Sequence, residues 1–516
     1  MLKRLKAGAA PAALALVLTI SAGAAHAQAP SAVAAPPGKP FIIPIAGYDL
    51  AKLGYTTEEF FVSGEATSYK LPGPPPADGR WAVTPDKTAP YVTRILVARP
   101  DSAKFNGTVV VEWLNVTSGT DTPVDWWTMH REMLRKGYAW VGVTAQSVGV
   151  EGGDPAAPSP TMVPPPLKKI NPARYGRLSH PGDAFSFDMF SQVGKLLHSP
   201  GAGGVLGPLA PARIIAVGES QSAVYLTTYV NAVAPRARAY DGYLIHSRFA
   251  VSASLDGDMS IRNLRSLPQN VRIRTDLPVP VIVVQTETDV SGNPAFSPRG
   301  GDPIPGTYSV RQPDTNRLRV WETPGTAHAD NYLARLGSSD SGELTPQAFA
   351  AALAPFSDLR GQKLVKPMNF NPAQHYVAEA ALRSLDQWIA TGKAPPKGAP
   401  IKVADAAAEG LAKPAVDANG NALGGIRTPW IDAPTARLAG TGNQAVDGTK
   451  VLFGLGEPFD TAKLAELYPG GKAEYLTKFR AALDSTIKAG FILPDDRQEI
   501  LDVAAAAYDR ITAGSP

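Results

Sequence analysis

Cysteine is absent from this chain of 516 residues, which excludes disulfide bonds, thiolate catalysis and cysteine zinc sites. An excess of one charge is absent as well. The formal net charge is +4, but three of the 50 basic residues fall within the first six positions, which leaves 47 basic against 46 acidic residues. Such a balanced chain shows no electrostatic footprint for nucleic acid. Its stability must come from a large hydrophobic core.

Long hydrophobic runs are also missing, because no segment reaches the about 18 uninterrupted apolar residues of a membrane span. The amino terminus instead combines basic residues, a short apolar run over Leu14–Ile20 and an A-x-A pattern at residues 25–27. That order is typical of a secretory signal peptide. We therefore expect cleavage after Ala27 and export of the remainder to the periplasm or the medium.

Motifs for bound phosphates and metals are missing too. The chain has no G-x-x-x-x-G-K-[ST] segment and no H-E-x-x-H segment, so it signals neither a nucleoside-triphosphate site nor a catalytic metal. We expect no cofactor. Glycine and proline, by contrast, are abundant, with 48 and 49 residues, and follow no period. That composition indicates many long connections on a globular scaffold.

Short apolar runs alternate with segments of helical period, which predicts an α/β fold with a mostly parallel sheet covered by helices. The expected strands are Glu58–Ser63, Tyr91–Ala98, Thr108–Trp113, Ala139–Thr144, Ile214–Val217, Gly242–Ile245, Val281–Gln285 and Arg317–Trp321. The expected helices are Asp183–His198, Ser222–Ala234, His375–Thr391 and Gly471–Gly490. The long connections Ser147–Pro181 and Arg248–Pro280 are expected to form a lid or a pocket wall.

The segment R-I-I-A-V-G-E-S-Q-S-A, residues 213–223, places a serine at the apex of a turn after a β-type run. A nucleophilic serine needs an adjacent base and a fixed, exposed position, which a strained strand-to-helix turn supplies. Ser220 is the candidate nucleophile, with the small residues Gly218 and Ser222 two positions to either side. Ser222 is the less favoured alternative, because Val224 would crowd a turn centred on it. An ordinary serine N-cap is the competing structural interpretation.

Such a serine needs a histidine base and a carboxylate, which follow in the order serine, acid, histidine in this type of fold. The run P-V-I-V-V-Q-T-E-T-D predicts a strand ending in a turn with Glu287 and Asp289. The next expected strand leads into E-T-P-G-T-A-H-A-D, which contains His328, the candidate base. Asp289 is preferred as the acid for its position in the turn, although Glu287 has the longer reach.

The other histidines fit the role of base less well. His246 lies at a strand end but precedes both carboxylates, and His180 lies in a loop that either lines the site or caps the next helix. His130, His198 and His375 fall on expected helices, where packing or surface roles are more common.

A tetrahedral intermediate also needs hydrogen-bond donors for its oxyanion. We expect one from the backbone N–H of Gln221, which follows the candidate nucleophile. A second is expected from the loop within residues 109–119, with Leu114 and Asn115 as candidates. The sequence has no H-G-G-G motif there, and Asn115 is equally typical of an ordinary turn.

A likeness to one family extends over most of the chain, in F-N-G-T-V-V-V-E-W-L-N-V, R-Y-G-R-L-S-H-P-G-D, V-G-E-S-Q-S-A, V-V-Q-T-E-T-D-V and G-G-I-R-T-P-W-I-D-A-P-T-A-R-L. These stretches resemble the α/β-hydrolase superfamily, and more narrowly the exported bacterial proteins described as alpha/beta hydrolase domain-containing. The resemblance implies an α/β-hydrolase fold and esterase-like activity, but no particular substrate. It also implies a triad of Ser220, His328 and either Glu287 or Asp289. Tannase-like feruloyl esterases join serine and histidine by a disulfide, so the lack of cysteine argues against that branch.

We expect a signal peptide at residues 1–27, an α/β-hydrolase domain with an N-terminal extension and lid insertions at residues 28–397, and a C-terminal appendage packed on it at residues 398–516. The expected reaction is serine-dependent hydrolysis of a small or polymeric carboxylic ester through an acyl-enzyme. The alternatives are a lactone or amide hydrolase, an acyltransferase with the same triad, or an exported binding protein that kept the fold without the chemistry.

Overall fold

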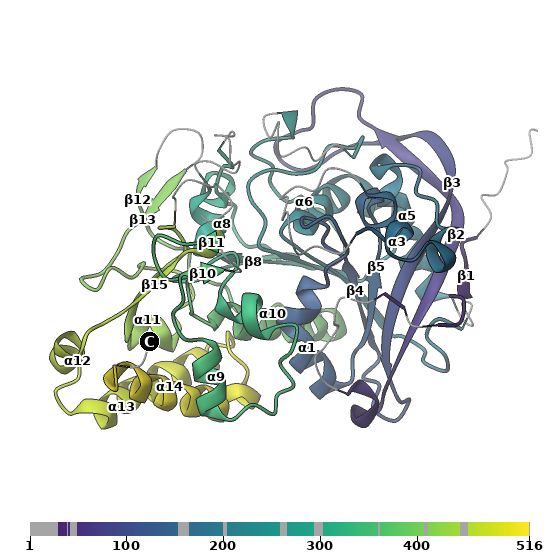
Figure 1. Cartoon of the computed structure of the whole chain (residues 1–516). Helices are drawn as coiled ribbons and strands as arrows, with labels where there is room; N and C mark the ends of the chain where they lie inside the picture. Colours follow the sequence, from purple (N-terminus) through teal and green to yellow (C-terminus); the bar gives the residue numbers. More distant parts are fainter. Residues whose placement is uncertain are drawn as a thin grey trace, which may run out of the picture.

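The structure is a computed structural model of the chain (Figure 1). It describes residues 29–514 except residues 39, 42–48, 153–164, 200–203, 258–265, 294–302, 360–361, 407–410 and 444–451. The expected signal peptide lies outside the described residues, as do parts of the two long connections. No helix within the described ranges is long and apolar enough to cross a membrane.

The central sheet has nine strands within the described residues. They are β1 (Ser31–Ala34), β2 (Tyr55–Lys70), β3 (Thr84–Pro100), β4 (Thr108–Trp113), β5 (Ala139–Val143), β6 (Arg213–Glu219), β7 (Gly242–His246), β8 (Val281–Thr286) and β9 (Leu318–Thr323). Their order across the sheet is β1-β2-β3-β5-β4-β6-β7-β8-β9. From β5 to β9 in this order all neighbours run parallel, whereas β1, β2 and β3 form an antiparallel edge. The sheet is therefore mostly parallel, as predicted.

Helices connect these strands and cover the sheet. The longer ones are α1 (Val124–Lys136), α5 (Ser186–His198), α6 (Gln221–Thr228), α10 (Ala373–Thr391), α13 (Gly471–Lys488) and α14 (Arg497–Thr512). Shorter helices and turns are η1 (Leu50–Leu53), α2 (Ser147–Glu151), α3 (Leu167–Ile170), α4 (Pro172–Tyr175), η2 (Asp183–Phe185), η3 (Tyr229–Val233), α7 (Ala234–Ala237), α8 (Glu287–Ser291), η5 (Thr307–Val310), η6 (Tyr332–Leu336), α9 (Pro346–Ala352), α11 (Pro429–Asp432), α12 (Thr461–Leu467) and η9 (Pro494–Asp496).

The two faces of the sheet have separate cores, because successive side chains of a strand point to opposite faces. Ile215 of β6 packs with residues of α1 and α10, whereas its neighbour Ala216 packs with residues of α5 and α6. All six residues of β4 are buried. Parallel strands that are covered on both faces appear in the sequence as continuous runs of apolar residues. This is why the predicted bounds of β4 agree with the structure.

The antiparallel edge is longer than the sequence predicts, since β2 and β3 pair over most of their lengths. Arg94 of β3 is buried there, with its Nη2 atom 2.6 Å from Asp121 and its Nη1 atom 3.5 Å from Glu59. Glu59 also forms an ion pair with Arg174, whose Nη2 atom lies 2.5 Å from Glu59 Oε2. Paired charges of this kind avoid the cost of burying a single charge.

The helices α12, α13 and α14 lie near α9, on the opposite side of the molecule from β1, β2 and β3 (Figure 1). Short strand pairs accompany them: β10 (Asp358–Leu359) with β11 (Gln362–Lys363), β12 (Val403–Ala406) with β13 (Ala412–Pro414), and β14 (Ala436–Ala439) with β15 (Leu455–Pro458). Phe479 and Leu483 of α13 are fully buried in a core shared with α14. The backbone N–H of Ile401 donates to Glu322 of β9 at 2.8 Å, so this region contacts the sheet directly.

One helix departs from its prediction. The expected helix over residues 222–234 begins as α6 but continues after Thr228 as the π-helical turn η3. The wider turn places Tyr229 in the aromatic cluster with Phe190 and Tyr240, at centroid distances of 5.5 and 5.9 Å. A 3.6-residue period in the sequence does not distinguish such a turn from a regular helix.

Candidate active site

Ser220 stands at the turn between β6 and α6, with φ of 56° and ψ of −117°. A residue with a Cβ rarely adopts positive φ, so this backbone is strained and must be held by its surroundings. The Ser220 N–H donates to the carbonyl of His246 on β7 at 3.0 Å, and its carbonyl accepts from Val224 at 3.1 Å. The side chain is half-buried at the carboxyl end of the parallel strands. The turn thus fixes a hydroxyl that remains accessible.

The small residues on either side allow this turn. A Cβ on Gly218 would lie 3.1 Å from the backbone carbonyl of Ser222 and 3.2 Å from its Cβ, which is tighter than ordinary contacts. Ser222, the alternative candidate, is fully buried. Its hydroxyl has no hydrogen-bond partner among the described residues. Ser222 therefore serves strand–helix packing and offers no accessible hydroxyl.

The structure brings Ser220, His328 and Asp289 together in one line of contacts. His328 Nε2 lies 2.7 Å from Ser220 Oγ, and His328 Nδ1 lies 2.7 Å from Asp289 Oδ1. His328 sits in the loop after β9, and its backbone N–H donates to Thr288 at 3.1 Å. The ring of Phe249 stacks on the imidazole at a centroid distance of 5.3 Å. These contacts fix the position and the plane of the imidazole.

The two candidate acids have different partners. Asp289 lies in the first turn of α8, where its Oδ2 atom accepts from the N–H and the hydroxyl of Thr286 at 2.8 and 2.7 Å. This capping box leaves Oδ1 for His328. Glu287 accepts instead from the backbone N–H groups of Gly325 and Gly440, at 2.7 and 3.0 Å. Burial raises the pKa of Glu287 to about 7. Glu287 therefore joins loops, whereas Asp289 contacts the imidazole.

Sequence reasoning missed Glu219, the residue before the candidate nucleophile. Its Oε1 atom lies 3.5 Å from His328 Nε2, and its Oε2 atom accepts from the Asn115 side chain at 3.3 Å. The side chain is buried. Burial and the nearby carboxylates of Asp125, Asp289 and Glu112 raise the pKa of Glu219 well above its usual value. Its position inside the V-G-E-S-Q motif was the available signal.

The predicted oxyanion donors are only partly free. Gln221 opens α6, so its backbone N–H has no acceptor within the helix. The N–H of Asn115 donates to the Thr122 carbonyl at 3.0 Å, and the N–H of Leu114 donates to Val143 at 3.2 Å. The N–H of Val116, one residue further, makes only a 3.3 Å contact with the side-chain oxygen of Gln221. The Asn115–Thr122 bridge turns the loop so that Val116 approaches the turn that carries Ser220.

The sequence profile of the alpha/beta hydrolase domain family matches residues 21–502. The chain belongs to this family. The matched range includes β6, α6, α8 and the loop of His328. No curated protein matches the chain.

Similar solved structures include a protein of Xanthomonas campestris described as an α/β serine hydrolase without lid. It is 12% identical, with a TM-score of 0.27, and the match covers 51% of this chain and 86% of that chain. An esterase of Pyrococcus furiosus is 10% identical, with a TM-score of 0.28, over 54% of this chain and 86% of that chain. The match to the family over residues 21–502 thus makes this protein an α/β hydrolase.

In this α/β hydrolase the remaining histidines have other partners. His246 Nδ1 lies 3.0 Å from Asp125 in the interior. The His246 carbonyl accepts from the Ser220 N–H, so the end of β7 helps to hold the Ser220 turn. His180 Nε2 lies 2.9 Å from the Ala145 carbonyl, in the loop before η2. The rings of His130 and His375 are buried, the latter against Tyr332 at a centroid distance of 4.1 Å. None of these four contacts Ser220 through its side chain in the described structure.

Proposed function

We propose that this protein hydrolyses carboxylic esters, with Ser220 as nucleophile, His328 as general base and Asp289 as the orienting acid. The observation that carries the proposal is the pair of 2.7 Å contacts that join Ser220 Oγ, His328 and Asp289 Oδ1. A serine within hydrogen-bond reach of a base, which is itself oriented by a third group, is the arrangement that activates a hydroxyl.

In the proposed reaction His328 Nε2 accepts the Ser220 proton while Oγ attacks the ester carbonyl carbon. The imidazolium then returns that proton to the leaving alcohol as the C–O bond breaks, which leaves an acyl-enzyme. Water attacks this ester in the same way, and the Ser220 hydroxyl and a carboxylic acid are released. Asp289 holds the tautomer with Nδ1–H and stabilises the imidazolium without taking its proton.

The oxyanion in this proposal is held by the backbone N–H groups of Gln221 and Val116. Val116 replaces Asn115, because the Asn115 backbone N–H already donates to Thr122 and its side chain donates to Glu219. The 3.3 Å contact of Val116 with Gln221 Oε1 is long for an N–H···O bond. A charged oxyanion would be the stronger acceptor and would displace it.

Export through the amino-terminal signal peptide is part of the proposal, and it rests on the sequence pattern of residues 1–27 alone. An amide or a lactone would be attacked by the same Ser220–His328 pair, so the p-nitrophenyl ester and anilide panels below distinguish them by their leaving groups. A binding protein that retained the fold would have no need for the strained Ser220 backbone or for a carboxylate-bound histidine beside it.

The purified protein should hydrolyse p-nitrophenyl esters from acetate upward, with a burst of p-nitrophenol equal to the enzyme concentration wherever deacylation is slow. A panel from acetate to palmitate measures both activity and acyl preference. A matched panel of p-nitroanilides tests the amide alternative, and added alcohols test acyl transfer. Turnover of anilides with none of esters would replace the ester proposal, and no turnover of either would favour the binding protein.

A further inference from the structure

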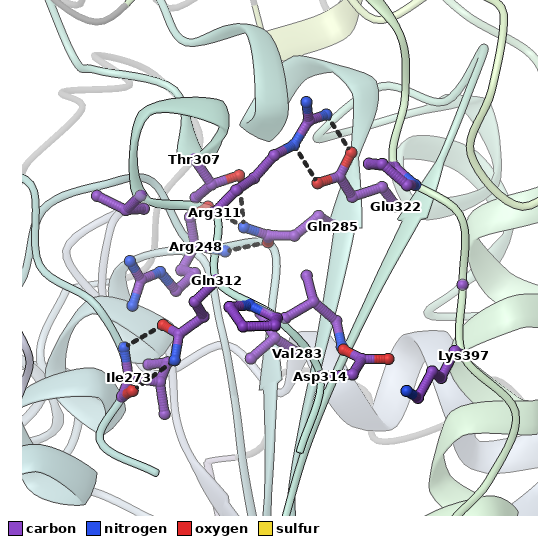
Figure 2. Close-up of a pocket in the computed structure, with 15 residues that line it drawn as sticks. Arg248, Ile273, Val283, Gln285, Thr307, Arg311, Gln312, Asp314, Glu322 and Lys397 are labelled. Carbon is purple, nitrogen blue, oxygen red and sulfur yellow. Dashed lines mark hydrogen bonds and ion pairs between the residues drawn. The ribbon is translucent and has the colours of Figure 1, made fainter.

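A cavity of about 490 Å³ lies against β8 and β9, beside η5 and residues 397–400. Its lining includes neither Ser220 nor His328. Figure 2 shows Arg248 and Lys397 on opposite sides of this cavity, with Gln285 near its middle and the Arg311–Glu322 pair along its upper side. Volumes of about 300–1,000 Å³ are typical of small-molecule sites. The cavity is large enough for an organic ligand.

Arg248 is the unusual member of the lining. The side chain is 2% exposed, and its Nη1 atom has no hydrogen-bond partner in the described structure. Its Nη2 atom donates to one neutral group, the carbonyl of Val271. Burial without a compensating carboxylate lowers the pKa of Arg248 to about 9, which still leaves it charged at neutral pH.

The other buried arginines of the described chain show what Arg248 lacks. Arg94, Arg174 and Arg319 are 2–7% exposed, and each lies within 4 Å of a carboxylate. Burying a cation without such a partner is costly. An unpaired buried arginine beside a cavity therefore indicates a counter-ion that the described part of the chain does not supply.

Arg248 is also held in place before any ligand arrives. Its backbone N–H donates to Gln285 Oε1 at 3.0 Å, and its carbonyl accepts from Gln285 Nε2 at 2.9 Å. Gln285 Nε2 in turn contacts the hydroxyl of Thr307 at 3.0 Å. A site fixed in this way loses little conformational entropy when a ligand binds.

The remaining lining limits the kind of anion. Five ionisable residues line the cavity, three basic and two acidic, so it carries about one positive charge in excess. Arg311 is already occupied by Glu322, at 2.5 Å. Ile273, Val283 and Val310 supply apolar walls. One net charge and apolar walls match a monoanion with a hydrophobic body better than a phosphate dianion.

We propose that this cavity binds a small organic carboxylate, whose charged group pairs with Arg248 while its apolar body lies against the valine and isoleucine walls. The site is separate from Ser220 and does not depend on the proposed hydrolysis. A planar carboxylate matches the donor geometry of a guanidinium group.

Calorimetric titration of benzoate into the Ser220→Ala protein, at constant ionic strength, tests the proposal with the catalytic hydroxyl removed. Benzoate should bind saturably with one site, and neutral benzamide should not bind. Phenyl phosphate should bind more weakly than benzoate. Absence of saturable benzoate binding would overturn the proposal, and tighter binding of phenyl phosphate would overturn the assignment to a carboxylate.

The variant Arg248→Met removes the buried charge and should weaken benzoate binding about tenfold to a hundredfold. Without ligand it should melt at or above the temperature of its parent, because an unpaired buried cation is removed. The matched control is Lys397→Met, which removes an exposed charge from the same cavity and should weaken binding less than about threefold. Equal binding by Arg248→Met and its parent would overturn the proposal.

Discussion

The imidazole of His328 has a carboxylate near each of its nitrogens. Asp289 lies 2.7 Å from Nδ1, and Glu219 lies 3.5 Å from Nε2, the nitrogen that also contacts Ser220. The two acids differ in their surroundings. Asp289 is held by Thr286 in a capping box, whereas Glu219 accepts one side-chain amide and lies among other carboxylates. We expect Asp289 to orient the imidazole through Nδ1, whereas the raised pKa of Glu219 keeps its carboxyl protonated to higher pH than an ordinary glutamate.

Asp289→Asn should lower kcat about ten-thousandfold, because an amide there no longer holds the Nδ1–H tautomer of His328. Glu287→Gln is the matched control, since Glu287 accepts from Gly325 and Gly440 and does not contact the imidazole. It should keep kcat within about tenfold while losing about 1–3 kcal/mol of unfolding free energy, as one backbone N–H loses its acceptor. Steady-state kinetics and urea unfolding measure the two effects. The reverse order of kcat losses would make Glu287 the acid.

The raised pKa of Glu219 predicts a second ionisation in the pH dependence of kcat/KM. Because its pKa is raised well above the usual value, Glu219 stays protonated to higher pH than an ordinary glutamate and ionises above that range. The new charge beside His328 Nε2 favours the imidazolium of the transition state, so kcat/KM should continue to rise on the alkaline side. Glu219→Gln keeps the neutral shape and should match the wild type at pH values where the Glu219 carboxyl is protonated, but reach a plateau above them.

The measurement is kcat/KM against pH for both proteins with one ester. Two identical alkaline limbs would show that the Glu219 carboxyl does not act on His328. A large loss in Glu219→Gln at every pH would mean that the ionised carboxyl is required throughout the profile, contrary to the account.

At the scale of elements, the geometry of the Ser220 turn depends on how closely β6 and α6 approach each other. Gly218→Ala places a methyl group 3.1 Å from the Ser222 carbonyl, so α6 must shift by a few tenths of an ångström. Misplaced catalytic groups lose rate steeply. We expect kcat to fall about tenfold to a hundredfold while KM changes little. Kinetics and a melting curve measure this, and unchanged kcat would show that the turn tolerates a wider spacing.

The buried parallel strands and an amphipathic helix such as α13 could be predicted from the sequence, whereas the full length of the antiparallel pair β2–β3 could not. The apolar run of β4 and the strand–turn–helix at Ser220 have local signals. The bridge between Asn115 and Thr122, seven residues apart in one loop, and the π-helical turn η3 have no comparable sequence motif. Within the predicted loop the N–H groups of Leu114 and Asn115 already have carbonyl acceptors, whereas that of Val116 makes only the long contact with Gln221; the donor itself stays a prediction.

At the scale of the whole molecule, the contacts of the carboxyl-terminal part with the candidate site could not be predicted from the sequence either. Its irregular segment reaches the turn that carries the acid, where Gly440 donates to Glu287 and its carbonyl accepts from Thr288. The N–H of Ala329, next to His328, donates to the Leu452 carbonyl. Composition indicated only a loop there. Contacts between residues separated by more than a hundred positions leave no local pattern, so the support of the His328 loop by this part could not be predicted.

The central claim is that Ser220 is a nucleophile activated within the intact chain. The most direct measurement is the mass of the whole protein after reaction with a fluorophosphonate, followed by mapping of the modified peptide. We predict one adduct per chain, located on Ser220, absent from Ser220→Ala and formed more slowly in Asp289→Asn. An adduct on Ser222, or an ester-hydrolysing wild type that takes up no label at Ser220, would contradict the account.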